Sequence, residues 1–273
     1  MSTHRPRRKT TVQSFIAKKA NGEKITVLTA YDAFMAKLLD HAGIDGILVG
    51  DSASNVIHGY ETTLPIPLEI MIAHTAAVSR GTEKALVIAD MPFLSFQPST
   101  EVAITNAGRF LKEGGAEAVK IEGGVEIAPT IKRLVELGIP VMGHIGLTPQ
   151  SIHRFGGPKV QGREDRSRNY LKESALALEA AGCFAIVLEL MESQLAGEIT
   201  ESLQTAATIG IGAGVNCDGQ VLVVNDMLGL KDAEFKPKFL RQYADLATII
   251  SDAVGRYIED VRSGKYPSLD ESF

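Results

Sequence analysis

The sequence predicts a (β/α)₈ barrel, the TIM-barrel fold, from three observations. Short runs rich in β-branched residues recur along the chain, and stretches with helical periodicity separate most of them, which is typical of a parallel sheet covered by helices. About eight such runs in 273 residues favour a closed barrel over an open doubly wound sheet. No G-x-G-x-x-G motif follows the first run, which weakens the dinucleotide-binding alternative.

The predicted strands are the eight short apolar runs. They are ITVLTA (25–30), GILVGDS (46–52), ALVIADMP (85–92), AVKIEGG (118–124), VMGHIG (141–146), FAIVLEL (184–190), TIGIGAG (208–214) and QVLVVND (220–226). Too few residues for a full helix separate the last two strands, so we expect the turn GVNCDG in place of a helix.

Four intervening segments have a clear helical pattern. They are residues 32–43, 99–115, 127–138 and 167–182. The first places Phe34, Leu38 and Leu39 on one face, and the second begins at a candidate N-cap, Ser99 or Thr100.

A long amphipathic helix is expected after the last strand, over roughly residues 236–263. Its apolar stripe comprises Phe239, Leu240, Tyr243, Leu246, Ile250, Val254, Tyr257, Ile258 and Val261. Such a stripe is either ordinary core or a surface for a partner.

Composition narrows the class of protein. We expect a single barrel domain over residues 1–273, with a flexible basic tail at about residues 1–10. No apolar run reaches the ~18 residues of a membrane span, and the basic tail has no apolar stretch behind it, so it is not a secretory signal. The net charge of −5, without a basic aromatic-rich face, argues against nucleic acid. Cys183 and Cys217 lack a CxxC partner, which indicates reduced thiols in a cytoplasmic protein.

Charged residues interrupt one of the apolar strands. In AVKIEGG, Lys120 and Glu122 lie two positions apart, and alternation along a strand places them on one face, roughly 6–7 Å apart. One interpretation is a local ion pair at the end of the strand. The other is that both side chains face an active site, because catalytic groups of barrels lie at the carboxyl ends of the strands.

Polar residues end several other predicted strands. They are Asp51 with Ser52, Asp90, His144, Glu189, and Asn225 with Asp226. Each alone is most simply structural, but carboxylates from four strands would converge on one mouth, where their repulsion requires a cation or protons. Oxygen ligands favour Mg²⁺, and the His and Cys spacing of a zinc site is absent. The resulting hypothesis is that Glu122 faces a metal while Lys120 faces an anionic substrate or a developing oxyanion.

Three loops follow these strands. The first, residues 53–69, is long enough to suggest a lid or binding loop, and the second, MPFLSFQPS (91–99), is aromatic. The third, residues 144–165, is rich in glycine and basic residues, which suits either a bound anion or a solvated surface.

At these residues the chain resembles the ketopantoate hydroxymethyltransferase family, also called 3-methyl-2-oxobutanoate hydroxymethyltransferase. The resemblance covers nearly the whole chain and rests on LTAYDA (28–33), VGDS (49–52), TTLP (62–65), DMPF (90–93), AVKIEGG, VMGHIGLTPQS (141–151), KVQGR (159–163), AGCFAIVLE (181–189) and TIGIGAGVNCDGQVLVVNDMLG (208–229). It departs at residues 53–55, where the family often has Leu-Gly-Met, and at residues 190–193, where it often has Val-Pro. These changes leave the charged positions intact and affect only the adjoining loops.

The resemblance implies a barrel of the phosphoenolpyruvate/pyruvate-enolate type and a large homo-oligomer, a decamer of two stacked rings. It implies transfer of a hydroxymethyl group from 5,10-methylenetetrahydrofolate to 3-methyl-2-oxobutanoate through a Mg-stabilised enolate, giving 2-dehydropantoate and tetrahydrofolate on the route to pantothenate and coenzyme A. By position, the magnesium ligands are Asp51, Asp90 and Glu122; the keto-acid contacts are Asp51, Ser52, Asp90 and Lys120; and the catalytic base is Glu189.

The chemistry of these residues agrees with that assignment. A metal and Lys120 near the keto oxygen would stabilise an enolate, and ionised Glu189 would remove the proton. His144 lies on the strand between those of Lys120 and Glu189, where it either orients a carboxylate or a water or is an ordinary core residue.

Three rival interpretations remain. An enolate-forming lyase or mutase of the isocitrate-lyase kind would use the same cluster, but the K-[KR]-C-G-H-type motif typical of those enzymes is absent. A Schiff-base aldolase could use Lys120 as its amine. A non-catalytic keto-acid sensor with this fold should have lost one of the four carboxylates Asp51, Asp90, Glu122 and Glu189, and all are present.

Overall fold

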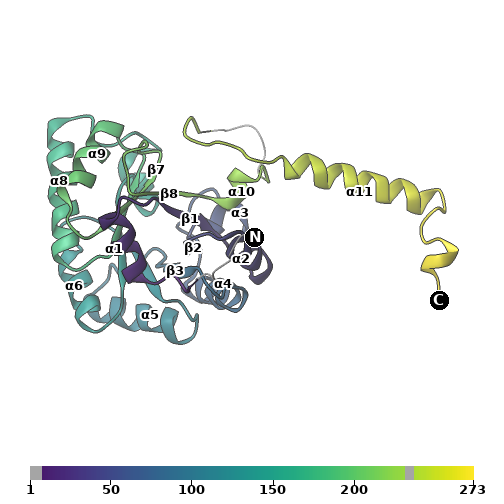
Figure 1. The fold of residues 1–273 in the computed structure, drawn as a ribbon, viewed down its shortest axis with the longest axis horizontal. Coiled ribbons are helices and arrows are strands. Elements are labelled where there is room, and N and C mark those ends of the chain that lie inside the picture. Colours follow the sequence, from purple (N-terminus) through teal and green to yellow (C-terminus); the bar gives the residue numbers. More distant parts are fainter. Residues whose placement is uncertain (1–7, 231–236) are drawn as a thin grey trace, which may run out of the picture. The chain divides into compact units, whose positions relative to one another are not determined.

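The computed structural model describes residues 8–230 and 237–273. Eight parallel strands close into a barrel in sequence order, with β8 pairing β1 (Figure 1). The strands are β1 Ile25–Thr29, β2 Gly46–Val49, β3 Leu86–Asp90, β4 Ala118–Glu122, β5 Val141–Gly146, β6 Ala185–Glu189, β7 Ala207–Ile211 and β8 Gly219–Leu222. The predicted TIM barrel is therefore confirmed.

Helices follow most of the strands. They are α1 Val12–Ala20, α2 Ala33–Ala42, α3 Ala53–Val56, α4 Leu68–Gly81, α5 Thr100–Lys112, α6 Ala128–Glu136, α7 Ile152–Phe155, α8 Asp165–Ala180, α9 Ser193–Ser202, α10 Val224–Met227 and α11 Leu246–Arg262, with short 3₁₀ turns at Pro149–Ser151 and Leu269–Glu271. None of these described helices combines the length and apolar character needed to cross a bilayer.

Most element predictions are confirmed. The four predicted helices correspond to α2, α5, α6 and α8, and Ser99 caps α5 by accepting a hydrogen bond from Val102 N–H. Residues 212–218, all of them described, form a connection without a helix between β7 and β8, as expected.

Two local predictions are wrong. In α2, Phe34 and Leu38 are 73% and 49% exposed, and only Leu39 of the predicted apolar face is buried, together with Ala36. The last strand ends at Leu222, because the backbone turns into α10 at Val224.

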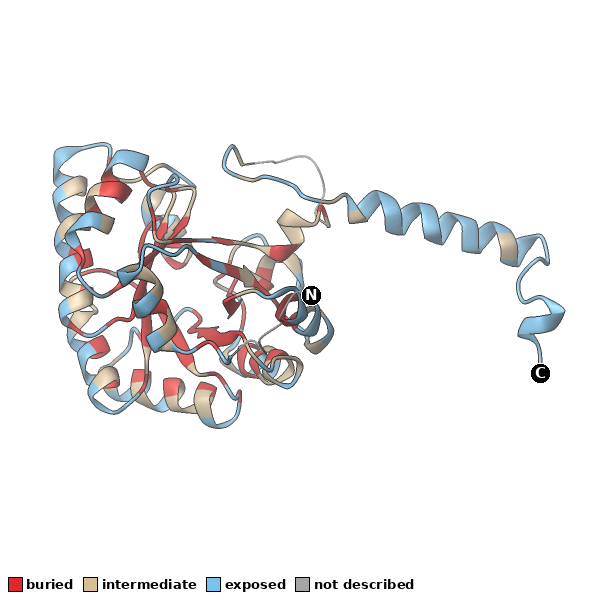
Figure 2. Cartoon of the chain, viewed as in Figure 1, coloured by how far each residue is buried: buried red, intermediate tan, exposed pale blue. Residues whose placement is uncertain are grey.

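The core fills the barrel and its amino-terminal end (Figure 2). Strands β2, β3, β4 and β5 are buried along their whole length, since helices cover one face and the barrel interior the other. Phe15 of α1 is fully buried and packs edge-to-face on Phe184, with ring centroids 5.7 Å apart. Burying a side chain of this size contributes roughly 1.5–3 kcal/mol. The buried Phe15 thereby holds α1 against the core of the barrel.

Part of the predicted tail is attached to the barrel. Thr10 N–H donates to Lys84 O, and Lys9 Nζ donates to Ala85 O and to Glu117 Oε2, each at 2.7 Å. The remainder of the predicted tail, residues 1–7, lies outside the described residues.

The chain divides into two compact units, Met1–Val223 and Val224–Phe273. The first contains the barrel, and the predicted single domain over residues 1–273 stays a prediction. In the second unit the predicted helix is shorter than expected, because Asp245 caps α11 through Thr248 N–H and the helix begins at Leu246. Phe239, Leu240 and Tyr243 therefore precede the helix, and residue 236 lies outside the described residues.

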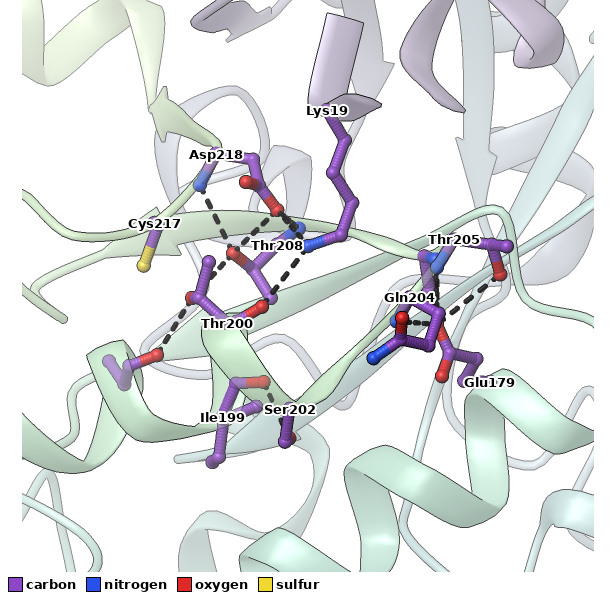
Figure 3. A network of polar contacts seen from close by, with 12 residues as sticks. Lys19, Glu179, Ile199, Thr200, Ser202, Gln204, Thr205, Thr208, Cys217 and Asp218 are labelled. Atoms are coloured by element: carbon purple, nitrogen blue, oxygen red, sulfur yellow. Dashed lines mark hydrogen bonds and ion pairs between the residues drawn. The ribbon is translucent and has the colours of Figure 1, made fainter. Parts of the chain in front are cut away.

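A polar network closes the amino-terminal end of β7 and β8 (Figure 3). Asp218 Oδ2 accepts hydrogen bonds from Thr208 N–H at 2.8 Å and from Lys19 Nζ at 2.9 Å. Lys19 Nζ also donates to Thr200 O, and the Thr200 and Thr208 hydroxyls are 2.8 Å apart. This network joins α1, α9, β7 and the start of β8, where no helix separates the last two strands.

Candidate active site

All seven predicted site residues line one cavity at the carboxyl ends of the strands. It encloses about 180 Å³, and its walls include Asp51, Ser52, Asp90, Lys120, Glu122, His144 and Glu189. These residues come from β3, β4, β5 and β6 and from the turn after β2. The structure brings all seven together, and their roles in a site stay predictions.

Strand register brings the charges together. Asp90 is the register partner of Lys120 across β3 and β4, and Glu122 is the register partner of His144 across β4 and β5. Alternation then places Lys120 and Glu122 on the same inward face of β4. Both are buried, so neither charge is a surface feature.

Lys120 pairs with Asp90 more closely than with Glu122. Its Nζ lies 2.6 and 2.7 Å from the two Asp90 oxygens but 4.0 Å from Glu122 Oε1. The local ion pair on one strand is therefore the weaker contact, and the principal one joins two strands. Burial disfavours the charged Lys120, yet Asp90, Glu122 and Asp51 together hold the pKa of its ammonium above the ordinary value.

The carboxylates of the site are in excess. Burial raises the pKa of Asp90 to about 7, with Lys120 opposing the shift and Asp51 and Glu122 adding to it. Burial also raises the pKa of Glu122, although His144 and Lys120 oppose it. One lysine therefore does not offset the carboxylates of this cavity.

His144 lies between two glutamates. Its Nδ1 is 3.3 Å from Glu122 Oε1 and its Nε2 is 3.2 Å from Glu189 Oε2. Burial and Lys120 lower the pKa of the imidazole, but the two carboxylates outweigh them and raise it to about 9. The raised pKa favours a protonated ring near neutral pH, and the ring lies between one carboxylate from β4 and one from β6.

Several atoms of this group are not satisfied by the protein. Glu122 Oε1 and both ring nitrogens of His144 are buried, and neither imidazole contact has hydrogen-bond geometry with any described residue. Buried polar atoms without partners are costly and are typical of sites that bind something further.

The donor set fits a hard divalent cation. Asp51 in the turn after β2, Asp90 on β3 and Glu122 on β4 offer carboxylate oxygens, and Glu122 Oε1 has an open acceptor position. Within residues 8–230 and 237–273, no three His, Cys, Asp or Glu side chains already form a set that could hold a metal ion. Mg²⁺ commonly takes only one or two protein carboxylates and completes its shell with water and substrate, so these residues suit it.

Two residues that the sequence interpretation missed organise the site. Gln150 donates from its backbone N–H to Glu122 Oε2 and from its side-chain amide to Asp51 Oδ2, both at 3.0 Å. The buried Tyr31 places its hydroxyl 2.8 Å from Ser52 Oγ. Both lie in motifs noted above, LTAYDA and GLTPQS, but nothing local identifies which cavity they reach.

The backbone beside Glu189 is unusual. Leu190 has φ = 44°, a left-handed conformation that non-glycine residues rarely adopt, at one of the positions where the sequence departs from its family pattern. Gly146 lies opposite with φ = 101°, and a Cβ there would lie 2.2 Å from Glu189 O. These constraints fix the chain direction on both sides of Glu189, as is common where a side chain must be held in place.

Other polar residues of the strand ends take different positions. Asn225 and Asp226 belong to α10 rather than to a strand end, so their suggested place beside the other carboxylates is not confirmed. In the basic loop, Arg154, Lys159 and Arg163 are exposed.

Comparison with known proteins gives a consistent result. The sequence model of the ketopantoate hydroxymethyltransferase family matches residues 9–269. A 3-methyl-2-oxobutanoate hydroxymethyltransferase from Syntrophus aciditrophicus is 54% identical over 273 residues, covering 100% of both chains. One from Geobacter sulfurreducens is 55% identical over 255 residues, covering 93% of this chain and 95% of its own.

Solved structures share the fold at low sequence identity. A phosphonopyruvate hydrolase complexed with oxalate and Mg²⁺ has a TM-score of 0.59 at 14% identity, covering 96% of this chain and 93% of its own. A 2,3-dimethylmalate lyase of the PEP mutase/isocitrate lyase superfamily has a TM-score of 0.58 at 17% identity, covering 97% and 91%. These structures share the barrel fold of this chain.

Proposed function

The chain belongs to the ketopantoate hydroxymethyltransferase family, and from this premise we propose that it transfers the one-carbon unit of 5,10-methylenetetrahydrofolate to 3-methyl-2-oxobutanoate. The family reaction is hydroxymethyl transfer that gives ketopantoate, as the name of its curated relatives states. With the folate donor, one water is consumed, tetrahydrofolate is released, and the product supplies pantothenate and coenzyme A synthesis in the cytoplasm.

The observation that carries the proposal is the group Glu122–His144–Glu189, in which the two ring nitrogens of His144 face one glutamate each. Removing the C3 proton of a keto acid needs an ionised base in reach of the substrate. Glu189 lines the cavity with a side chain 21% exposed, and the protonated imidazole of His144 lies 3.2 Å from it. Glu189 thus combines access to substrate with a cationic neighbour, and we assign it the role of base.

The opposite wall suits the keto-acid end of the substrate. Lys120 presents a fixed ammonium that would stabilise the oxyanion forming as the proton leaves. Ser52, whose hydroxyl lies 2.8 Å from that of Tyr31, would contact the substrate carboxylate. Asp51 and Asp90, with Glu122, would hold Mg²⁺, which when bound supplies Lewis-acid polarisation of the keto oxygen.

The same geometry disfavours two rival mechanisms. A Schiff-base aldolase needs a neutral amine, but both oxygens of Asp90 hold Lys120 as an ammonium and its pKa is raised. A keto-acid sensor has no need of a base, yet Glu189 reaches the cavity beside a protonated histidine.

The direct test is formation of tetrahydrofolate from methylenetetrahydrofolate and 3-methyl-2-oxobutanoate, with Mg²⁺ and after its removal by chelation. We expect turnover that depends on both substrates and on the metal. The half-reaction gives a second reading: with Mg²⁺ but without folate in D₂O, the C3 proton should exchange for deuterium, seen by NMR. Tetrahydrofolate formation without consumption of the keto acid would reject the proposal, and so would the absence of tetrahydrofolate formation with both substrates present.

We also propose a large homo-oligomer, a decamer. Several apolar side chains of α11, among them Ile250, Val254 and Tyr257, are at least half exposed in the described chain. A water-exposed stripe of this kind is typical of an interface. Sedimentation equilibrium at micromolar concentration should give a mass near ten chains, and a monomer would contradict this.

A further inference from the structure

A second cavity opens beside the catalytic one, over the carboxyl ends of β4 and β5. It encloses about 430 Å³, against about 180 Å³ for the catalytic cavity, and the two share Glu122 as a lining residue. Its volume is within the usual range for small-molecule sites. The lining residues used below are Phe93, Glu126, Phe155 and Tyr170.

Size separates the two substrates of the proposed reaction. The smaller cavity accommodates a keto acid but lies below the volume range of drug-sized ligands, and a folate is several times larger than the keto acid. The donor must therefore extend into space that adjoins the reacting carbon. Among the described residues, the larger cavity adjoins the catalytic one through Glu122.

Gln150 lies between the two cavities. Gln150 lines the larger cavity while its side chain reaches Asp51 in the smaller one, and its backbone N–H holds Glu122 Oε2. A second amide, Gln97, donates to Gln150 Oε1 at 3.0 Å from the side of the larger cavity. A ligand in the larger cavity would thus lie within one residue of the proposed metal carboxylates.

The walls offer flat aromatic surfaces. Phe93 and Tyr170 are each 39% exposed, and Phe155 of α7 also lines the cavity. Aromatic side chains left partly exposed around a cavity are the surfaces on which a planar heterocycle stacks, worth roughly 1–3 kcal/mol for a nucleic-acid base.

One carboxylate in this cavity is held in a fixed orientation. Glu126 Oε1 accepts from Gly124 N–H at 3.0 Å and Oε2 accepts from Tyr170 O–H at 2.7 Å. Gly124 is required there, because a Cβ at that position would lie 2.2 Å from Ser174 Oγ. Each carboxylate oxygen keeps a second lone pair, so Glu126 can accept two further parallel hydrogen bonds.

The pterin of a tetrahydrofolate has two adjacent donors, N3–H and the 2-amino group, which match a carboxylate. We propose that the larger cavity binds the pterin ring of the one-carbon donor, with Glu126 accepting from these two donors and the aromatic walls enclosing the ring. This assignment rests on the proposed function for the identity of the donor. It makes Glu126 a binding residue for folate and leaves the keto-acid chemistry to the smaller cavity.

The test measures tetrahydrofolate binding by titration calorimetry, together with folate-free deuterium exchange into 3-methyl-2-oxobutanoate. Glu126→Gln keeps the size of the side chain but turns one acceptor oxygen into a donor. We expect tetrahydrofolate to bind roughly 10- to 100-fold more weakly, because hydrogen bonds to a charged group are lost, while exchange proceeds at the wild-type rate. Glu136→Gln, at the exposed end of α6, is the matched control and should change neither quantity.

A second variant keeps the test decisive if Glu126→Gln does not fold. Phe155→Ala removes an aromatic wall without touching Glu126, and we expect tetrahydrofolate affinity to fall about tenfold or more with exchange intact. Wild-type affinity in both variants would overturn the assignment of the cavity. Absence of tetrahydrofolate formation by the wild type with both substrates and Mg²⁺, with tetrahydrofolate binding still weakened by Glu126→Gln, would reject the proposed reaction while supporting the assignment.

Discussion

The two ends of the barrel use carboxylates in opposite ways. At the amino-terminal end, acidic side chains accept hydrogen bonds from backbone amides and lysines: Asp40 from three successive amides of residues 83–85, Asp45 from Lys18 and Thr26, and Asp218 from Lys19 and Thr208. At the carboxyl-terminal end, the mouth of the barrel, Lys120 donates to Asp90, while Glu122 has a buried oxygen without a hydrogen-bond donor among the described residues.

The electrostatic result differs accordingly. Burial raises the pKa of Asp45, but Lys18 and Thr26 outweigh it and the pKa is lowered overall; for Asp40 the backbone amides have the same effect. At the mouth burial prevails and the pKa values of Asp90 and Glu122 are raised. The amino-terminal carboxylates therefore stabilise the fold, and those of the mouth are held at a cost that a bound cation and substrate would relieve.

The largest expected effect lies at the mouth. Glu189→Gln keeps the shape of the side chain but cannot accept a proton, so folate-free deuterium exchange should fall by roughly 10²–10⁴-fold. The melting temperature, followed by circular dichroism, should change little, since the side chain is partly exposed and glutamine keeps its shape. Exchange at the wild-type rate would remove Glu189 as the base and make His144 the next candidate.

The second effect lies at the opposite end. Asp218→Ala leaves Lys19 and the Thr208 amide without their acceptor in a region where the two charged side chains are only 16% and 10% exposed. We expect a loss of about 2–3 kcal/mol in the free energy of unfolding by urea, with exchange per folded molecule unchanged. The exposed pair of Arg133 and Glu136 gives the control, because Glu136→Ala should cost less than about 0.5 kcal/mol.

How far the sequence predicts each end follows from this contrast. The mouth was predictable, because parallel strands bring their carboxyl ends together and charged residues at the ends of apolar runs are conspicuous. The ion pairs within the mouth were not predictable. Lys120 and Glu122 are close neighbours along β4, yet the register between β3 and β4 pairs Lys120 with Asp90, thirty residues away.

Residues contributed by loops escaped the prediction for a related reason. Gln150 and Tyr31 act through contacts with Asp51 and Ser52 across the cavity, and periodicity carries no information on such contacts. The carboxylates of the amino-terminal end were equally hidden, because an acidic residue is ordinary in a turn, as at Asp218, or near the end of a helix, as at Asp40. The start of α11 was misplaced because the apolar spacing continues through residues 237–245 while the cap at Asp245 sets the boundary.

A third prediction compares one carboxylate from each end directly. Glu122→Gln removes a proposed metal ligand, and we expect Mg²⁺ affinity measured by calorimetry to fall by at least about tenfold, since even loss of a residue supporting a ligand commonly costs that much. Metal-free stability should be unchanged or higher, because one of the repelling carboxylates is gone. Asp218→Ala should show the reverse, unaltered Mg²⁺ affinity with lower stability. Unchanged Mg²⁺ affinity in Glu122→Gln, Asp51→Asn and Asp90→Asn alike would contradict a shared metal site.

The smallest effect concerns acid. The folded-state pKa of Asp45 is lowered from its ordinary value of 3.8, so the folded protein binds this proton less readily than the unfolded chain. The stability that Asp45 contributes is therefore fully present above that ordinary value and is lost as pH falls through the lowered one. Urea unfolding from pH 6 to pH 3 should show wild type losing stability more steeply below about pH 4 than Asp45→Asn, whose amide does not titrate. Asp252→Asn, on the exposed face of α11, should follow wild type throughout. A constant difference between wild type and Asp45→Asn across this range would mean that Lys18 and Thr26 do not stabilise the charge of Asp45, and the contrast between the two ends would then rest on geometry alone.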